Sequence, residues 1–362
     1  MRLAIDASRT TVPRVTGTER YAVRLLQALI ALDSGHEITL YFRDPPPPGL
    51  FAPRPRVTQR VIPFARAWTH ARFAAALRQD QPDVTFVPAH TLPLCFPGPG
   101  VVTVHDLGYR HFPDAHPARQ RRYLDLTTRH SARRAAVVLA DSGATAEDLA
   151  LFYRTPPAKI RVVYPGVDAP PVGDVAAVRA KYRLPQRYFL FLGTLQPRKN
   201  IAVIVQSYQR WRAAHPDDGA GLVLAGAKGW LYDDAWAAGL PGVTLTGYVD
   251  DGDRGALYAG ALALVFPSLY EGFGFPVVEA MHCGAPVIAS NTSSLPELAG
   301  DAGLLVDPLD VNAIAAKLAR LAASAELRAE LAAKGRARAA QFTWERAASL
   351  ALRALEDAAH AR

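Results

Sequence analysis

Apolar and polar positions along this chain follow two alternating patterns. Short β-branched runs are separated by longer stretches rich in alanine, leucine and arginine, in which apolar side chains recur at helical spacing. This pattern is typical of parallel sheets covered by helices. Strands are expected at residues 3–5, 38–42, 84–87, 101–104, 137–140 and 160–163, and in a second series at 188–192, 221–225, 243–246, 263–266, 286–289 and 303–306.

The two strand series indicate two domains. The Gly- and Pro-rich segment 165–173 lies between them and is predicted to be a linker. The chain is therefore expected to form two doubly wound, Rossmann-like α/β domains, at residues 1–169 and 170–344. Facing sheets would enclose a cleft at the carboxyl ends of their strands, where open α/β sheets bind ligands. Helices are also expected at residues 19–32 and, capped by Thr343, at residues 343–360.

Composition narrows the class of protein. With 362 residues, of which 50% are hydrophobic, the chain is long enough for two separate cores. No apolar run approaches the ~18 residues of a membrane-spanning helix, and the first residues do not resemble a signal peptide, so a cytoplasmic protein is expected. Cys95 and Cys283 lie far apart without metal-ligand spacing, and both are expected to be buried thiols.

The formal net charge of +8 favours an anionic partner, which could be phosphate, a membrane surface or nucleic acid. Abundant arginine, alanine and proline are also what a GC-rich genome encodes, and composition does not choose between these explanations. Segment 110–134 concentrates the charge, with seven arginines against Asp114 and Asp125. It is either a solvated basic face or a surface that meets anionic lipid or a lipid-diphosphate acceptor.

The segment YEGFGFPVVEAMHCGAPVIAS carries the strongest local signal. It follows the strand expected to end at residue 266, and Pro276 suits the first turn of a helix. Because Gly272 and Gly274 leave little side-chain bulk, the amides of residues 273–275 are able to approach a phosphate or a sugar. This loop is therefore a candidate anion site.

Two carboxylates belong to the same segment. Glu271 lies in the loop and Glu279 about one turn inside the helix, and carboxylates are good acceptors for sugar hydroxyls. The alternative is a tight turn before an ordinary helix, with both glutamates solvated near its positive end. The combined spacing favours a shared pocket.

A basic pair forms the second signal. In FLGTLQPRKNI, Arg198 and Lys199 come directly after a strand and before a helix expected to be capped by Asn200. A guanidinium and an ammonium at that sheet edge can bind a diphosphate through charge-assisted hydrogen bonds. Basic pairs are also common on protein surfaces, so the interpretation as a diphosphate site depends on the position of the pair at the end of a strand.

In the first domain, Gly17 of TGTERYA lies in a predicted strand-to-helix loop at residues 15–18. His105 and Asp106 of TVHDLGYR follow a hydrophobic strand. A histidine beside an aspartate is often a structural hydrogen-bonded pair. At the carboxyl end of a strand, contact with a substrate is an equal alternative.

Together these motifs resemble the retaining glycosyltransferase family four, in particular bacterial mannosyltransferase-like members. Glu271 and Glu279, separated by seven residues, resemble its paired-glutamate signature. The resemblance covers nearly the whole chain and extends to ADSGATAEDL, KIRVVYPGVD, GTLQPRKN, TGYVDDGDRGALYAGA and SNTSSLPELAGDAGLLVDP. It implies the GT-B fold, in which an acceptor-side and a nucleotide-sugar-binding Rossmann-like domain face each other across a cleft. It also implies that the final helix, residues 345–362, packs back on the first domain.

The resemblance implies roles in the second domain. Arg198 and Lys199 would bind the donor diphosphate, and Glu279 the donor ribose. Glu271 and the backbone of Phe273, Gly274 and Phe275 would hold the transferred sugar.

Other roles implied by the resemblance lie elsewhere in the chain. His105 would contact the sugar near the reaction centre, and Gly17 would let the first domain approach the phosphates. The backbone around Tyr248 and Val249 would hold the base.

The resemblance also implies a mechanism without a metal. Negative charge builds on the departing diphosphate, and fixed positive groups stabilise it as it develops. Retaining members are thought to use front-face attack, in which the leaving phosphate accepts the acceptor's proton, so no general base is named. Asp250, Asp251 and Asp253 come close to a metal-binding acidic pair, but their family counterparts form a turn leading into a helix.

Rival functions share the architecture. A nicotinamide dehydrogenase is excluded because no G-x-G-x-x-G follows an early strand. A phosphorylase would need a pyridoxal-binding lysine that the sequence does not identify. A nucleotide-sugar epimerase and a non-catalytic nucleotide-sugar sensor remain alternatives. AGAKGWLY and SSLPELAGDAG resemble bacterial mannosyl- and rhamnosyltransferases, which favours GDP-mannose as donor, a glycan or lipid-linked acceptor and no nucleic acid partner.

Overall fold

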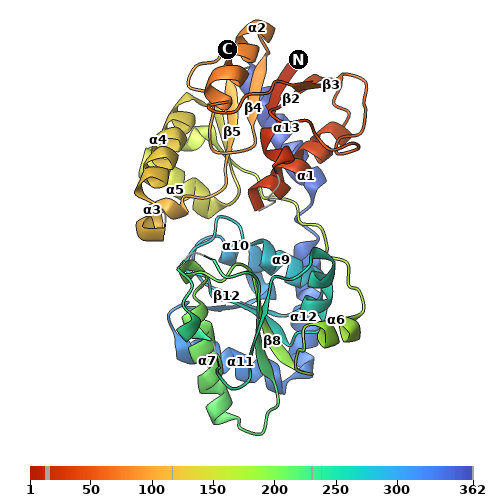
Figure 1. Ribbon diagram of the computed structural model, residues 1–362, viewed down its shortest axis with the longest axis vertical. Coiled ribbons are helices and arrows are strands. Elements are labelled where there is room, and N and C mark those ends of the chain that lie inside the picture. The colour runs from red at the N-terminus through yellow and green to blue at the C-terminus, as the bar shows by residue number, and fades with distance from the viewer. Residues whose placement is uncertain (13–16, 116, 230, 238, 361–362) are drawn as a thin grey trace. The chain divides into compact units, whose positions relative to one another are not determined.

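Figure 1 shows the computed structural model, which describes residues 1–12, 17–115, 117–229, 231–237 and 239–360. The chain forms two compact units. Unit 1 comprises Met1–Gly166 and Thr343–Arg362, and unit 2 comprises Val167–Phe342. Each unit contains one parallel sheet, which confirms the predicted α/β class with two Rossmann-like domains. Residues 15 and 16 of the predicted glycine loop, and Trp230 of AGAKGWLY, lie outside the described residues.

The sheet of unit 1 has seven strands in the order β3-β2-β1-β4-β5-β6-β7. The strand order reverses between β1 and β4. In doubly wound sheets, ligands bind at the carboxyl ends of the two strands that flank such a reversal. The strands are β1 (Arg2–Asp6), β2 (Glu37–Phe42), β3 (Val57–Val61), β4 (Val84–Val87), β5 (Gly100–Val104), β6 (Val137–Ala140) and β7 (Ile160–Val162). The sequence did not predict β3, because this edge strand is half-buried or exposed throughout and carries Thr58, Gln59 and Arg60 instead of an apolar run.

Helices cover both faces of this sheet, because its strands carry apolar side chains on both sides. On one face, α1 (Gly17–Ala31) packs against α13 (Trp344–His360), which also contacts β4, β5 and β6. On the other, buried residues of α2 (Ala74–Asp80), α4 (Ala118–Arg134) and α5 (Gly143–Tyr153) join one core with alternate strand residues. Thr343 caps α13 as predicted, accepting a 3.2 Å hydrogen bond from the amide of Arg346.

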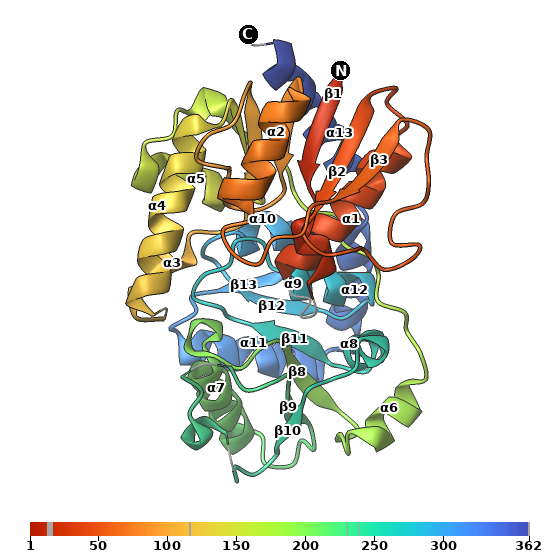
Figure 2. The same ribbon diagram turned by 45° about the horizontal axis from the view of Figure 1, so that its top comes forward.

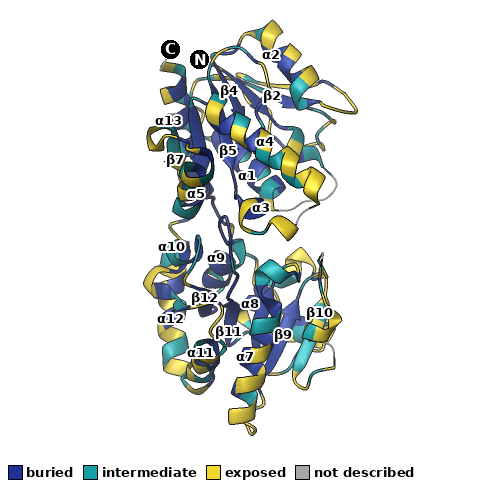
Figure 3. Cartoon of the chain, turned by 90° about the vertical axis from the view of Figure 1, so that its left-hand side faces the viewer, coloured by how far each residue is buried: buried dark blue, intermediate teal, exposed yellow. Residues whose placement is uncertain are grey.

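Helix α4 buries only a narrow stripe. Thr127, Thr128, Ser131 and Ala132 are buried, whereas most of its arginines are exposed (Figure 3). The short helix α3 (Gly108–His111) packs against it. Figure 2 shows α4 lying beside α5, with which it is in contact.

The sheet of unit 2 has six strands in the order β10-β9-β8-β11-β12-β13, which reverses between β8 and β11. The strands are β8 (Tyr188–Leu192), β9 (Gly221–Ala225), β10 (Val243–Gly247), β11 (Ala263–Phe266), β12 (Val287–Ser290) and β13 (Leu304–Val306). Helix α7 packs against α11, and α9 packs against α8, α10 and α12. The helices are α6 (Val175–Lys181), α7 (Ile201–Ala214), α8 (Arg254–Ala259), α9 (Phe275–His282), α10 (Leu295–Ala299), α11 (Val311–Ala323) and α12 (Ala325–Ala339).

One prediction about the cysteines is wrong. Cys95 is exposed and Cys283 is half-buried. Cys95 lies in the proline-rich loop between β4 and β5, where no helix covers it. Among the described residues, no helix combines the length and apolar character needed to cross a membrane.

Candidate functional site

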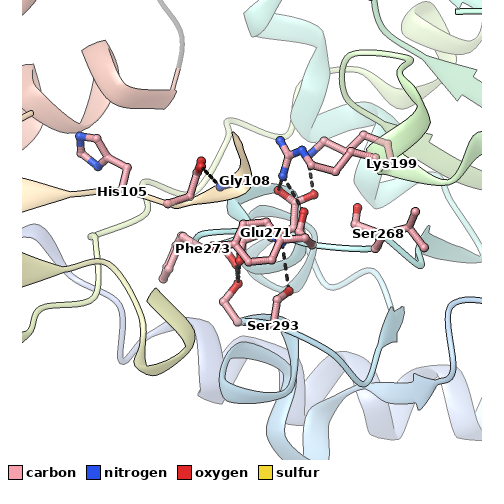
Figure 4. A network of polar contacts seen from close by, with 12 residues as sticks. His105, Gly108, Lys199, Ser268, Glu271, Phe273 and Ser293 are labelled. Carbon is pink, nitrogen blue, oxygen red and sulfur yellow. Dashed lines mark hydrogen bonds and ion pairs between the residues drawn. The ribbon is translucent and has the colours of Figure 1, made fainter. Parts of the chain in front are cut away.

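Arg198 and Lys199, both half-buried, form an ionic group with the buried Glu271 at the point where the strand order of unit 2 reverses. Arg198 and Lys199 lie in a turn after β8, and Glu271 lies in the loop after the neighbouring strand β11. Lys199 Nζ lies 2.5 Å from Glu271 Oε1, and Arg198 Nη1 lies 3.2 Å from Oε2 (Figure 4). Two segments separated by more than seventy residues therefore meet at the carboxyl ends of neighbouring strands. The sequence placed each of them after a strand but did not predict their ion pairs.

Burial makes this group electrostatically strong. The side chains of Lys199 and Glu271 are 11% and 8% exposed. Burial alone would raise the pKa of Glu271, but the charges of Lys199 and Arg198 outweigh it, and the pKa of Glu271 lies below its ordinary value. Glu271 is therefore an anion that neutralises part of the charge of two cations.

Asn200 holds the basic turn in place from the N-cap position of α7. It adopts a left-handed conformation (φ 61°), and its side chain makes no capping hydrogen bond. Its buried Nδ2 instead donates to Pro267 O at 3.1 Å and to Pro308 O at 2.6 Å. Asn200 is thus the N-cap residue of α7, as predicted, but its side chain ties together the loops after β11 and β13 instead of capping the helix.

The loop before α9 is a close-packed backbone turn. Gly274 has φ 122°, and a Cβ there would lie 2.7 Å from Leu295 Cδ2 in α10, so glycine is required. Ser293 Oγ accepts a hydrogen bond from the Glu271 amide at 3.0 Å, and Ser294 donates to Glu271 O and Phe273 O. Within the described part of the chain, no group accepts a hydrogen bond from the amides of Gly274 or Phe275. Figure 4 shows Glu271 and Phe273 of this turn beside Ser293, which comes from the loop between β12 and α10.

Glu279 lies in the second turn of α9 and is 2% exposed. Its Oε2 accepts hydrogen bonds from the Arg254 guanidinium and, at 3.0 Å, from the Tyr258 hydroxyl. Burial raises the pKa of Tyr258 well above its ordinary value, and the negative charge of Glu279 raises it further. The sequence analysis missed Arg254 and Tyr258, although their i, i+4 spacing at the start of a helix places both on one face.

The loop after β10 contains the residues predicted to hold the base. Tyr248 is 70% exposed and Val249 is buried. The neighbouring aspartates form a turn that leads into α8, as expected. Lys181 Nζ contacts Asp250 at 2.7 Å and Asp253 at 2.6 Å. In the described ranges, no group of three or more His, Cys, Asp or Glu residues could hold a metal ion.

In unit 1, His105 follows β5 and pairs with Asp141, not with Asp106. Its Nδ1 lies 2.7 Å from Asp141 Oδ2, and both side chains are buried. Asp106 instead accepts a hydrogen bond from the Gly108 amide. Burial lowers the pKa of His105, but the charge and hydrogen bond of Asp141 outweigh it, so the pKa is raised. Asp141 follows the adjacent strand β6, a juxtaposition that the sequence did not predict.

Two further residues flank His105. His90 Nε2 accepts a hydrogen bond from the His105 amide at 3.3 Å, and burial lowers the pKa of His90 to about 4. The ring of Tyr21 in α1 lies edge-on to His105, with centroids 4.8 Å apart. Gly17 begins α1 and is exposed. The structure thus brings predicted site residues together with polar partners in both units.

Family models cover most of the chain. Residues 15–169 match the model described as Glycosyltransferase Family 4, and residues 176–338 match the model described as Glycosyl transferases group 1. The chain is 36% identical over 259 residues to O-antigen chain mannosyltransferase B of Escherichia coli. That alignment covers 68% of this chain and 67% of its relative.

Solved structures share the architecture. Sucrose-phosphate synthase from Thermosynechococcus elongatus matches with a TM-score of 0.74 and 24% identity over 100% of both chains. HepE from Anabaena, in complex with UDP and glucose, matches with a TM-score of 0.73 and 17% identity, over 99% of this chain and 100% of that one. At these identities the likeness shows the fold alone.

Proposed function

The chain belongs to the family 4 glycosyltransferases, and from that premise we propose that it transfers mannose from GDP-mannose to a glycan or lipid-linked acceptor, retaining the anomeric configuration. Membership makes the protein a glycosyltransferase of polysaccharide assembly with the GT-B fold. The main support for the proposal is the pairing of Arg198 and Lys199 with the buried Glu271 at the reversal of strand order.

Donor binding would rearrange this group. A diphosphate brings more negative charge to Arg198 and Lys199 than Glu271 does, so it would compete for both cations. The Glu271 carboxylate would then accept hydrogen bonds from the hydroxyls of the transferred sugar. The backbone amides of Phe273, Gly274 and Phe275 would add donors at the start of α9. Glu279 would accept from the ribose, and the backbone at Tyr248 and Val249 would hold the base.

The chemistry would follow from fixed charge. As the bond from the sugar to the diphosphate breaks, negative charge grows on the leaving oxygen, and Arg198 and Lys199 stabilise it more in the transition state than in the bound donor. The leaving phosphate would take the acceptor's proton, so no side chain acts as general base. His105 would contact the sugar, and Gly17 would allow unit 1 to approach the phosphates. No metal or cofactor takes part in this proposal.

The choice of donor and acceptor is based on relatives of this chain. Mannose is supported by the O-antigen chain mannosyltransferase B at 36% identity, and a guanine base would accompany it. Uracil is the competing base, because HepE was solved with UDP. A nucleotide-sugar epimerase and a non-catalytic sensor are disfavoured by family membership. The arginines of segment 110–134 would support peripheral contact with an anionic membrane where a lipid-linked acceptor resides.

A thermal-shift screen tests the donor. GDP-, UDP-, ADP- and dTDP-sugars are compared at equal concentration, since a ligand that binds only the folded state raises its stability. GDP-mannose should give the largest rise. Radiolabelled GDP-mannose incubated with glycan acceptors should then yield a larger α-linked product. A rise without turnover would favour a sensor, and turnover with UDP-sugars alone would contradict the donor.

A further inference from the structure

Unit 1 contains a surface cavity of about 680 Å³ that none of the proposed donor-binding residues lines. It lies at the carboxyl-terminal ends of α4 and α5, which run side by side (Figure 2). Five basic side chains converge on it from three separate segments, and no carboxylate lines it among the described residues. These side chains are Arg110, Arg129, Arg133, Arg154 and Lys159.

Two of the cations are partly neutralised. Arg110 Nη1 lies 3.2 Å from Asp125 Oδ1, and Arg129 Nη2 lies 3.5 Å from Oδ2 of the same carboxylate. The hydroxyl of Tyr153 also donates to Asp125 at 2.9 Å. One carboxylate therefore serves two guanidinium groups, and positive charge remains in excess.

The other three cations add to this excess. Lys159 Nζ donates to Arg133 O and Ala135 O, at 3.2 and 2.9 Å, and thereby offsets the negative end of α4. Arg133 and Arg154 are exposed, and within the described ranges neither guanidinium has a hydrogen bond or ion pair. Like charges held together on ordered segments favour a bound anion.

Thr155 distinguishes this cavity from an ordinary solvated basic surface. It contributes to the wall, is 3% exposed, and its hydroxyl lacks a hydrogen-bond partner in the described part of the chain. A buried hydroxyl without a partner costs free energy, and a phosphate oxygen could accept a hydrogen bond from it once the Thr155 side chain turns toward the cavity. Leu151, 70% exposed, adds an apolar side chain to the wall.

We propose that this cavity is a second anion site, which binds the phosphate or diphosphate group of a ligand distinct from the sugar donor. Arg133, Arg154 and Lys159 supply the charge, Arg110 and Arg129 complete the wall, and Thr155 donates a hydrogen bond. The ligand is a soluble phosphate compound or a lipid phosphate. The site is separate from Arg198 and Lys199, and its lipid alternative rests on the membrane contact proposed above for segment 110–134, which supplies three of its five cations.

Three variants test the site. Arg133→Gln with Arg154→Gln removes two exposed charges. Thr155→Val removes only the hydroxyl and should leave the fold intact, because that hydroxyl makes no hydrogen bond. Arg346→Gln with Arg353→Gln, on exposed positions of α13, is the control with equal charge loss in the same unit.

Binding is measured by calorimetry with inorganic diphosphate, and by co-sedimentation with phosphatidylcholine vesicles containing phosphatidic acid. With the donor site saturated by the nucleotide sugar that the thermal-shift screen identifies, the double variant should weaken diphosphate binding at the cavity by about a hundredfold and Thr155→Val by about tenfold. The control variant should bind diphosphate as tightly as the wild type, because it keeps every residue of the cavity. Weak binding of phosphate to other basic groups on the surface is common to all variants. Stabilisation by the nucleotide sugar should not change, which separates failure here from failure of the proposed function.

Each outcome decides the proposal. Loss of both diphosphate and vesicle binding in the two site variants supports a lipid phosphate as the ligand. Loss of diphosphate binding alone supports a soluble phosphate compound. Equal losses in the site variants and the control, or unchanged binding in Thr155→Val, would reduce the cavity to a diffuse basic face and overturn the proposal.

Discussion

Glu271 and Glu279 are both buried carboxylates with cationic partners, but donor binding should affect them differently. The partners of Glu271 are themselves the proposed diphosphate ligands. Glu279 is held by Arg254 and Tyr258, which lie on α8 and have no proposed contact with the phosphates. Glu279 should therefore keep its position when the donor binds, as a fixed acceptor for ribose hydroxyls.

We expect Glu279→Gln to weaken nucleoside diphosphate binding by about 1.5–3 kcal/mol, because an amide replaces a charged acceptor. Titration calorimetry measures the loss. The change also removes the charged partner of the buried Arg254, so the variant must be titrated below its melting temperature.

Tyr258→Phe is the matched control. It removes one hydrogen bond to Glu279 but leaves the carboxylate and its pairing with Arg254. Nucleotide affinity should be retained while the protein loses about 0.5–1.5 kcal/mol of stability. If Glu279→Gln bound as tightly as this control, Glu279 would not belong to the donor site.

Asp141→Asn should lower the pKa of His105. Burial favours the neutral imidazole, and the raised pKa in the wild type depends chiefly on the charge and hydrogen bond of Asp141. With the carboxylate gone, less of His105 is protonated at any pH near neutrality. NMR titration of the imidazole protons reports the shift.

The control for this titration is Asp148→Asn, which removes the carboxylate 2.9 Å from His111 in the same unit. It should leave the titration of His105 unchanged. A His105 pKa that is equal in both variants and the wild type would mean that Asp141 does not set its protonation.

At the scale of elements, the loop that carries Arg198 depends on one side chain. We expect Asn200→Gly to destabilise the protein by about 1–3 kcal/mol, because the carbonyls of Pro267 and Pro308 lose their buried donor. Because glycine tolerates the left-handed backbone at this position, the loss of stability measures the missing hydrogen bonds and not backbone strain. The midpoint of urea unfolding measures it.

Asn291→Gly, at an exposed position after β12, serves as the control for added chain flexibility. Its unfolding midpoint should lie close to that of the wild type. Nucleotide affinity should fall only in the Asn200 variant, because it also loosens the basic turn. Equal destabilisation of both variants would assign the effect to the glycine itself.

The strands were predictable where both faces are buried. β4, β6, β8, β9 and β11 occur at the expected residues, since an apolar run between turn residues has few other structures available. β3 was missed because it carries no such run. α2 was missed although it begins with an apolar run, because seven residues are too short for a helical period to be recognised. The partners Asp141, Arg254 and Tyr258 were missed for another reason. Local spacing places Arg254 and Tyr258 on one helix face, but only strand pairing and helix packing bring these partners to His105 and Glu279.

At the scale of the whole molecule, we expect transfer to continue in EDTA, because Arg198, Lys199 and the start of α9 would supply the positive field that a divalent ion supplies elsewhere. The rate with radiolabelled donor is compared with and without chelator. Activity that vanished in EDTA and returned with Mn²⁺ or Mg²⁺ would contradict the prediction.

Unit 1 is built from both ends of the chain, and this has a consequence for biosynthesis. Residues 1–166 leave the ribosome before α13 is made. Helix α13 covers one face of α1 and of the sheet, so both faces stay exposed to solvent until α13 emerges. Unit 2 is continuous and can fold in between. At about 5–20 residues per second, translation of unit 2 leaves that apolar surface uncovered for roughly 10–35 s. The half of the protein made first is thus the half finished last, and during that interval it is the part that chaperones must protect.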